Sequence, residues 1–165
     1  MAGQKITPFL WFDNNAEEAA QFYTSIFKNS KILEVSRYGD AGPGPKGSVM
    51  VVKFQIAGQD VTALNGGPRF KFSEAFSLVV SCDNQKELDE YWSKLTSGGG
   101  EESMCGWLKD KFGFSWQIIP ANLGKLMGQK DPKKANRVMQ ALLKMRKLDI
   151  AALEQAAEDE VAISR

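Results

Sequence analysis

Alternation of apolar and polar residues predicts four short strands and one helix in the first part of the chain. The segment AEEAAQFYTSIF places Phe22 and Tyr23 on one face of a helix, and the preceding Asp13-Asn14-Asn15 run supplies an N-cap. A hairpin is predicted around Ala57-Gly58, because the runs on either side alternate and the turn ends in glycine. The predicted strands cover residues 6–12, 31–38, 48–56 and 59–65.

The same order of elements returns later in the sequence. FDNNAEEAAQFYTSIF and CDNQKELDEYWSKL both run from a strand through an Asp-Asn cap into a helix with an aromatic pair. The predicted strands of this second cycle cover residues 75–82, 107–109 and 114–119, with a helix from the Asp83-Asn84 cap through Leu95. A period this long indicates a duplicated β-α-β-β-β unit, with chance similarity as the alternative. We therefore predict a single α+β domain over residues 1–165, built from modules at about 4–66 and 74–120.

A helical extension is predicted over about residues 121–160. Pro132 suits a helix start, and KKANRVMQALLKMRKLD follows it. Residues 150–157 indicate a further short helix, and we expect the last residues to be frayed. An apolar stripe on the first of these helices indicates core packing, with a groove for a partner as the alternative. The stripe consists of Val138, Met139, Leu142 and Leu143.

Composition narrows the possible functions. The net charge is +1, which argues against a dedicated binder of nucleic acid or anionic membranes. No uncharged run approaches the roughly 18 residues that span a bilayer, and the first residues lack an apolar signal core, so we expect a cytoplasmic protein. Two cysteines, Cys82 and Cys105, are too few for a disulfide framework. The chain contains no histidine, the usual general base near neutral pH and the commonest metal ligand.

Several separated motifs resemble the PhnB-like branch of the vicinal oxygen chelate superfamily, also called the glyoxalase/bleomycin-resistance superfamily. They are KITPFLWFDNNAEEAAQFYTSIF, RYGDAGPGPKGSVM, TALNGGPRFKF and GWLKDKFGFSWQIIP, and the tail VMQALLKMRKLDIAALEQA is similar as well. The resemblance implies paired β-α-β-β-β modules whose curved sheets enclose a pocket, usually in a homodimer. Many members of this branch carry the label of a demethylubiquinone methyltransferase.

The resemblance also implies positions for metal ligands, which this chain fills with poor donors. Metal-using members place a histidine on the first strand and a glutamate on the last, and those positions fall near Pro8 and on Gln117. The intermediate positions fall near Ser77 and, beside a turn, on Asp60. Divalent transition metals favour imidazole, thiolate or carboxylate groups, and a closed site needs about four. We therefore expect no metal and no other cofactor.

Nucleotide and thiol chemistry find little support in the sequence. The Gly98-Gly99-Gly100 run follows a helix instead of preceding one, and Pro43 and Pro45 remove the N–H groups that a phosphate loop in residues 42–48 would need. Cys105 could act as a nucleophile, but no histidine is present to activate it. Asp110 suits a turn beside Gly113.

A ligand pocket is expected on the concave faces of the two sheets. Its largely aromatic wall suits a planar, partly apolar compound, with plain core packing as the alternative. In TALNGGPRFKFS, the Asn65-Gly66-Gly67-Pro68 break reads as the junction between modules, after which two phenylalanines turn inward. The predicted pocket residues are Phe9, Trp11, Met50, Phe54, Thr62, Leu64, Asn65, Phe70, Phe72, Trp107, Trp116 and Gln117.

The leading hypothesis is a metal-independent homodimer that binds an aromatic or quinone-like small molecule. The alternatives are an enzyme, either a methyltransferase or a lyase with an atypical metal site, and an interaction module that acts through the C-terminal helices. No nucleic-acid or membrane partner is expected from the charge and hydropathy of the chain.

Overall fold

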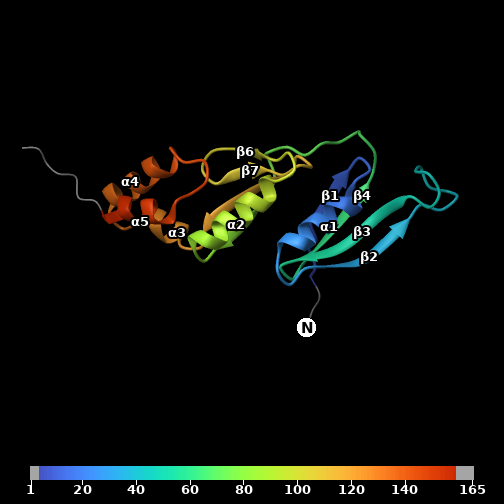
Figure 1. Cartoon of the computed structure of the whole chain (residues 1–165), viewed down its shortest axis with the longest axis horizontal. Coiled ribbons are helices and arrows are strands. Elements are labelled where there is room, and N and C mark those ends of the chain that lie inside the picture. The colour runs from blue at the N-terminus through green and yellow to red at the C-terminus, as the bar shows by residue number, and fades with distance from the viewer. Residues whose placement is uncertain (1–3, 159–165) are drawn as a thin grey trace, which may run out of the picture. The chain divides into compact units, whose positions relative to one another are not determined.

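The computed structural model describes residues 4–158, and the chain divides into two compact units with a boundary between Phe72 and Ser73 (Figure 1). Each unit contains one four-stranded mixed sheet. The boundary lies within the TALNGGPRFKFS stretch, after the Asn65-Gly66-Gly67-Pro68 break at which the sequence predicts a junction.

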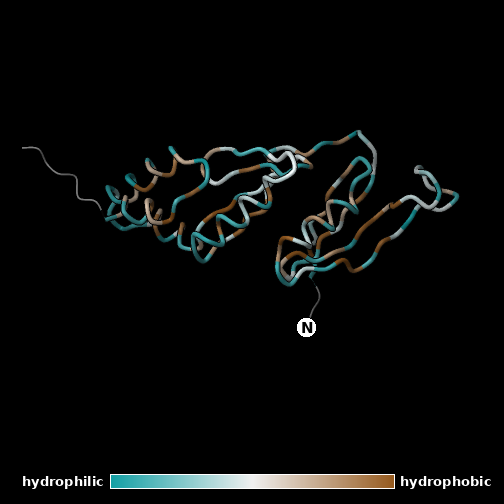
Figure 2. The backbone as a smooth tube through the Cα atoms, viewed as in Figure 1, coloured by the Kyte–Doolittle hydropathy of each residue, from teal (hydrophilic) through white to brown (hydrophobic). Residues whose placement is uncertain are grey.

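The first unit is a β-α-β-β-β module. Its strand order is β1-β4-β3-β2, in which β1 and β4 are parallel and the remaining pairs are antiparallel. The strands contain hydrophobic stretches, drawn in brown, whereas the loop of residues 39–47 is drawn in white to teal and is less hydrophobic (Figure 2). The elements are β1 (Phe9–Phe12), α1 (Ala16–Ile26), β2 (Lys31–Arg37), β3 (Val49–Ile56) and β4 (Gln59–Asn65).

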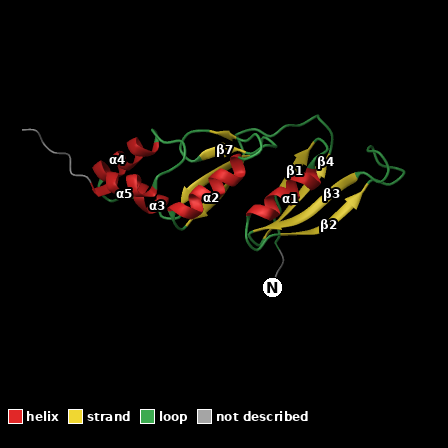
Figure 3. Cartoon of the chain, in the orientation of Figure 1, coloured by secondary structure: helices red, strands yellow, loops and turns green. Residues whose placement is uncertain are grey.

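The second unit repeats this topology. Its strand order is β5-β8-β7-β6, with β5 parallel to β8 and antiparallel pairing elsewhere. In each unit the helix that follows the first strand packs against the mixed sheet, as Figure 3 shows in red and yellow. The predicted α+β class with duplicated β-α-β-β-β units is confirmed. The elements are β5 (Ser77–Cys82), α2 (Gln85–Thr96), β6 (Glu101–Glu102), β7 (Trp107–Lys109) and β8 (Ser115–Pro120).

One face of each sheet is buried against its helix. In the first unit, Phe54 on β3 is fully buried and stacks on Tyr23 of α1, with ring centroids 6.3 Å apart. In the second unit, Trp116 and Ile118 of β8 and Leu88 of α2 are at most 2% exposed. Removal of these side chains from water is the main stabilising contribution to each unit.

Two strands begin at least two residues later than the sequence predicts. β1 starts at Phe9 and not at Ile6, which is 86% exposed, because Pro8 fixes φ and has no N–H for the ladder. β5 starts at Ser77, two residues after the predicted Ala75.

The N-terminus of α1 is capped by a side chain of strand β4. Asn15 occupies the N-cap position, but within the described chain its side chain makes no capping hydrogen bond. The Asn65 carboxamide of β4 instead accepts a bond from Ala16 N at 2.8 Å and donates to Val49 O at 3.1 Å. The predicted cap at residues 13–15 is therefore replaced by a long-range contact. At α2 the predicted Asn84 cap is confirmed, since its side chain accepts from Glu87 N at 3.0 Å.

The C-terminal helices belong to the second unit. The end of the first long helix and the burial of its apolar residues differ in part from the prediction. Helices α3 (Leu123–Met127), α4 (Pro132–Leu142) and α5 (Ile150–Glu158) are present. The first helix after Pro132 ends at Leu142, so residues 144–147 are not helical. Val138 is buried as expected, but Met139 is 40% and Leu143 is 58% exposed. The expectation of frayed final residues lies outside the described part of the chain.

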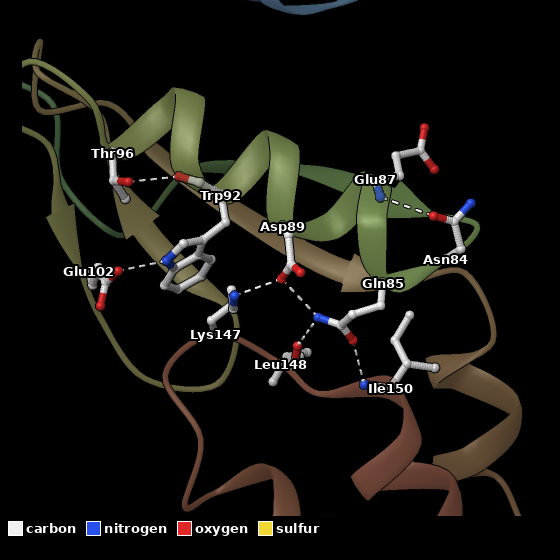
Figure 4. A network of polar contacts seen from close by, with 10 residues as sticks. All are labelled: Asn84, Gln85, Glu87, Asp89, Trp92, Thr96, Glu102, Lys147, Leu148 and Ile150. Carbon is white, nitrogen blue, oxygen red and sulfur yellow. Dashed lines mark hydrogen bonds and ion pairs between the residues drawn. The ribbon is translucent and has the colours of Figure 1, made fainter.

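The segment between α4 and α5 is held on α2 by a polar network (Figure 4). The Gln85 carboxamide donates to Leu148 O at 3.1 Å and accepts from Ile150 N at 2.9 Å. Lys147 pairs with Asp89 at 2.6 Å, and hydrogen bonds from Lys147 and Gln85 hold the pKa of Asp89 below its usual value. Leu148 itself is fully buried.

Within residues 4–158, every helix is too short or too polar to cross a lipid bilayer.

Candidate ligand-binding faces

We call the side of each sheet that faces away from its helix the open face. In the first unit the strand register brings four predicted pocket residues together there, because Phe9 lies beside Thr62 and Trp11 beside Leu64. Phe9 is 60% exposed. Val51 and Lys53 of β3 continue this face, since they pair with Leu64 and Thr62. The open face of the first unit therefore combines the aromatic rings of Phe9 and Trp11 with the polar side chains of Thr62 and Lys53.

Phe70 extends this surface from the loop after β4. Its ring meets Trp11 edge-on, with centroids 5.0 Å apart, and the indole N–H of Trp11 donates to Gly67 O at 2.8 Å. A Cβ at Gly66 would collide with the Trp11 ring, which explains the need for glycine at this break.

Four other predicted pocket residues lie on the opposite side of the same unit. Phe54 is in the core against Tyr23, and Met50 alternates with it on the helix-facing side of β3. The Asn65 side chain caps α1, and the Phe72 ring meets buried Phe12 edge-on at 5.1 Å. The expectation that these side chains line the open face is corrected for Met50, Phe54, Asn65 and Phe72.

The open face of the second unit carries Trp107, Lys109, Ser115, Gln117 and Ser77. These residues share one face because Trp107 pairs with Gln117, and Ser115 pairs with both Lys109 and Ser77. Gln117 Nε2 donates a hydrogen bond to Ser77 Oγ at 2.9 Å.

Trp116, also predicted in the pocket, points the other way. It is 2% exposed, and its indole N–H donates to Asp110 Oδ2 at 2.8 Å in the core. Asp110 also accepts from the backbone N–H of Phe112 and Phe114 at 2.9 and 3.1 Å, as its predicted role in the turn requires.

Residues at equivalent positions lie on the open faces of the two units. Phe12 and Cys82 end the first strands of the units, are both buried and both precede Asp-Asn. Three residues before each come Phe9 and Val79, and their partners on the parallel neighbour are Thr62 and Gln117. The family resemblance placed a metal-ligand position on Gln117 of β8 and suggested Asp60 as the corresponding residue on β4. The strand register instead makes Thr62 the residue of β4 that corresponds to Gln117.

These positions do not suit a divalent metal ion. Thr62, Ser77 and Gln117 supply neutral hydroxyl and amide groups, and the Gln117–Ser77 hydrogen bond already occupies two of them. Asp60 accepts a hydrogen bond from Gln55 at 2.7 Å. Within residues 4–158, no three His, Cys, Asp or Glu side chains come together in a group able to hold a metal ion. Transition metals require such donors, so the residues of neither open face provide the metal site that the family resemblance implies.

A cavity of about 370 Å³ lies on the second unit. Its volume falls within the range of small-molecule sites. Of the residues that line this cavity, only Trp107 was predicted from the sequence to line a pocket. The others come together through the β7–β8 register and the turn before β7, which the sequence does not show. The lining consists of Glu74, Ser103, Met104, Cys105, Trp107, Leu108, Lys109 and Ser115.

The turn that shapes this cavity is held by the C-terminal segment. Cys105 and Gly106 both have left-handed backbones, with φ of 60° and 84°. Their N–H groups donate to Met145 O at 2.7 Å and to Arg146 O at 2.8 Å. The tail therefore places Cys105 on the cavity wall. Cys82 is different, because burial, together with nearby Glu87 and Asp83, raises its pKa to about 12 and leaves an unreactive thiol.

The first unit has a cleft of about 480 Å³ that the sequence did not reveal. It lies where β1 and β4 end, beside the loop of residues 39–47, and Asp13, Glu17, Tyr38 and Asn65 are among its lining residues. Gly42 and Gly44 pack against the Tyr38 ring, since a Cβ at either would lie 2.5 Å from a ring carbon. The Tyr38 hydroxyl donates to Asn65 O at 2.7 Å.

The loop of residues 39–47 is not arranged to bind phosphate. The N–H groups of Gly47 and Ser48 donate to Tyr38 O at 2.9 Å and to Pro45 O at 3.0 Å, so neither is available for an anion. This arrangement agrees with the sequence interpretation of residues 42–48 as a plain loop.

Comparison with solved structures supports the fold independently. The chain is 40% identical to a putative 3-demethylubiquinone-9 3-methyltransferase, PhnB protein, from Bacillus cereus, over 70% of this chain and 99% of that one, with a TM-score of 0.64. The protein PA1353 from Pseudomonas aeruginosa is 21% identical over 72% of this chain and 97% of that one, with a TM-score of 0.58.

A more distant likeness is to the fosfomycin resistance protein FosX from Listeria monocytogenes, solved with Mn(II) and sulfate. It is 15% identical over 77% of this chain and 97% of that one, with a TM-score of 0.53, and indicates a shared fold. No protein of curated function matches the sequence.

The model of the family described as 3-demethylubiquinone-9 3-methyltransferase matches residues 4–119. This match spans both modules and stops before the C-terminal helices, so the resemblance of the tail to the same branch stays a prediction. The chain belongs to this PhnB-like family.

Proposed function

We propose that this protein binds a small, partly apolar aromatic compound on the open faces of its sheets, without a resident metal ion. The observation that carries the proposal is the cavity of about 370 Å³, in which Trp107 and Met104 lie beside the polar side chains of Lys109 and Ser115. Small-molecule sites typically combine an apolar wall with a few placed polar groups. Exposed Phe9 and Phe70 of the first unit add aromatic surface of the same kind.

The donor set supports metal independence. The family resemblance implies metal-ligand positions near Pro8 and Ser77, on Gln117 and on Asp60, and the register adds Thr62. Asp60, the carboxylate among them, already accepts a hydrogen bond from Gln55. Neutral oxygen and amide groups bind ligands through hydrogen bonds more readily than they bind Zn²⁺ or Mn²⁺. Binding and sequestration therefore fit these residues better than metal-assisted turnover.

A thermal-shift screen of aromatic compounds on chelator-treated protein tests this proposal. A ligand at a hundred times its Kd stabilises the folded state by about 2.7 kcal/mol, which is readily detected. Trp107→Ala should remove the shift because it removes the aromatic wall, while Leu143→Ala, on the exposed surface of the tail, should retain it. A library without a single binder, or a shift that Trp107→Ala leaves intact for every binder, would refute the proposal.

The junction offers a second test on the first unit. Phe70 contacts Trp11 on the open face, whereas Lys71 is exposed. Phe70→Ala should weaken ligand binding to the open face of the first unit more than Lys71→Ala does, and the opposite order would argue against binding on that face.

Methyl transfer is the second candidate, because the matching family is described as a methyltransferase. The part of the chain described by the structure places no glycine-rich strand-to-helix turn where a nucleotide-type cofactor would bind. Calorimetric titration with S-adenosylmethionine separates the two functions: measurable binding would favour the enzyme.

The family resemblance also implies a homodimer. Light scattering on the purified full chain tests this.

A further inference from the structure

Ser115, which lines the cavity of the second unit, carries a buried hydroxyl that no described residue uses. Its side chain lies on the open face with Lys109 and lines the cavity, and the residue is 1% exposed. Within residues 4–158, its Oγ has no hydrogen-bond partner. Buried hydroxyls are nearly always paired, because an unpaired one destabilises the fold relative to alanine. This hydroxyl therefore indicates a missing partner.

The charge around the cavity restricts what that partner can be. Lys109 Nζ lies 3.2 Å from carboxylate oxygens of both Glu74 and Glu101. Hydrogen bonds to Glu74 and Glu101 raise the pKa of Lys109, so the amine stays protonated. One cation between two carboxylates leaves a net negative charge, which disfavours an anionic ligand. A neutral oxygen meets no such repulsion.

The remaining wall favours an aromatic body. Trp107 and Met104 line the same cavity, and Met104 is 43% exposed while making up part of this wall. Indole rings stack on planar ligands, and thioether sulfur contacts ring edges favourably. A neutral ring with one polar atom would satisfy both the apolar wall and the hydroxyl.

We propose that this cavity selects neutral aromatic compounds bearing a hydroxyl or carbonyl oxygen, and that Ser115 Oγ forms the hydrogen bond to that oxygen. This inference rests on the proposed function and specifies its ligand. Serine can donate or accept, so phenols and quinones share the required chemistry.

The experiment is calorimetric titration of the full chain with three probes: 1-naphthol, tetramethyl-1,4-benzoquinone and 1-naphthoate. The quinone carries no ring hydrogen, which disfavours addition of the Cys105 thiol to the ring. We expect 1-naphthol, the quinone or both to bind more tightly than 1-naphthoate, and Ser115→Ala to weaken that binding about tenfold, as expected for loss of one hydrogen bond in a desolvated site. Ser93→Ala, an exposed serine on α2, is the matched control and should bind like the wild type.

A thermal melt of the same variants distinguishes recognition from loss of folding. Ser115→Ala should melt no lower than the wild type, because it removes an unpaired buried hydroxyl. A lower melting temperature for Ser115→Ala would show that the hydroxyl has a structural partner and would overturn the inference.

The outcomes separate this inference from the proposed function. Unchanged affinity in Ser115→Ala, or tighter binding of 1-naphthoate than of both neutral probes, overturns the inference alone. Binding of aromatic hydrocarbons in the screen without binding of either neutral probe does the same. Failure of every aromatic compound to bind overturns both. Whichever neutral probe loses affinity in Ser115→Ala identifies the class, phenol or quinone.

Discussion

At the scale of single residues, Gly106 lies in the turn that shapes the cavity and contacts both the sheet and the C-terminal segment. Its φ is 84°, its N–H donates to Arg146 O, and a Cβ there would lie 2.8 Å from Ile118 O and 3.1 Å from Leu148 Cδ1. Backbone oxygen cannot move aside cheaply, so a side chain at this position strains both the sheet and the tail.

Gly106→Ala should therefore lower the free energy of unfolding by about 2 kcal/mol. Urea denaturation measures this change. Gly39→Ala is the matched control, because no described atom lies within 4 Å of a Cβ at Gly39 and its φ is not positive. Equal stability of the two variants would show that the Gly106 turn tolerates a side chain.

At the scale of elements, the start of α1 depends on a strand distant in sequence. The Asn65 carboxamide accepts from Ala16 N and donates to Val49 O, so it joins α1, β3 and β4. Asn65→Ala should destabilise the protein by about 1–2 kcal/mol, since a cap and a second hydrogen bond are lost together. The effect is measured by urea denaturation.

Asn15→Ala provides the comparison for this cap. Asn15 occupies the N-cap position, but its side chain makes no capping bond within the described residues, so the change should stay within about 0.5 kcal/mol. A larger loss in Asn15→Ala than in Asn65→Ala would restore the sequence interpretation of the cap.

The order of helices and strands could be predicted from periodicity, whereas the face of each sheet that the helix covers could not. On β3, Val51 and Val52 are both apolar, so alternation marks two faces without showing which one α1 covers. Phe54 and Trp116 were for this reason placed in the pocket and are found in the core. The register of β7 and β8, which brings Lys109 beside Ser115, likewise depends on pairing between strands.

The end of α4 shows a similar limit. Apolar spacing continues to Leu143, but the helix stops at Leu142 and the following backbone pairs with Cys105 and Gly106. This contact links residues far apart in the sequence, and local helix propensity carries no information about it.

At the scale of the whole molecule, the C-terminal extension is an integral part of the second unit. Leu148 is fully buried, and the backbone around it bonds to Gln85 and to the turn before β7. Leu148→Ala should lower the free energy of unfolding by about 3 kcal/mol, because it leaves a cavity in the core. Leu143→Ala, at a residue 58% exposed, should cost at most about 0.5 kcal/mol in the same urea titration. A mild effect of Leu148→Ala would show that the tail is only loosely attached.

The central claim is that this member of the PhnB-like family binds an aromatic ligand through its own side chains and without a metal ion. The most direct test is a calorimetric titration of chelator-treated protein with 1-naphthol and tetramethyl-1,4-benzoquinone, repeated after addition of Zn²⁺ or Mn²⁺. We predict the same Kd with and without metal, because neither Thr62 on the first unit nor Ser77 and Gln117 on the second offers a suitable ligand set. Binding that appears only after metal is restored would contradict the account.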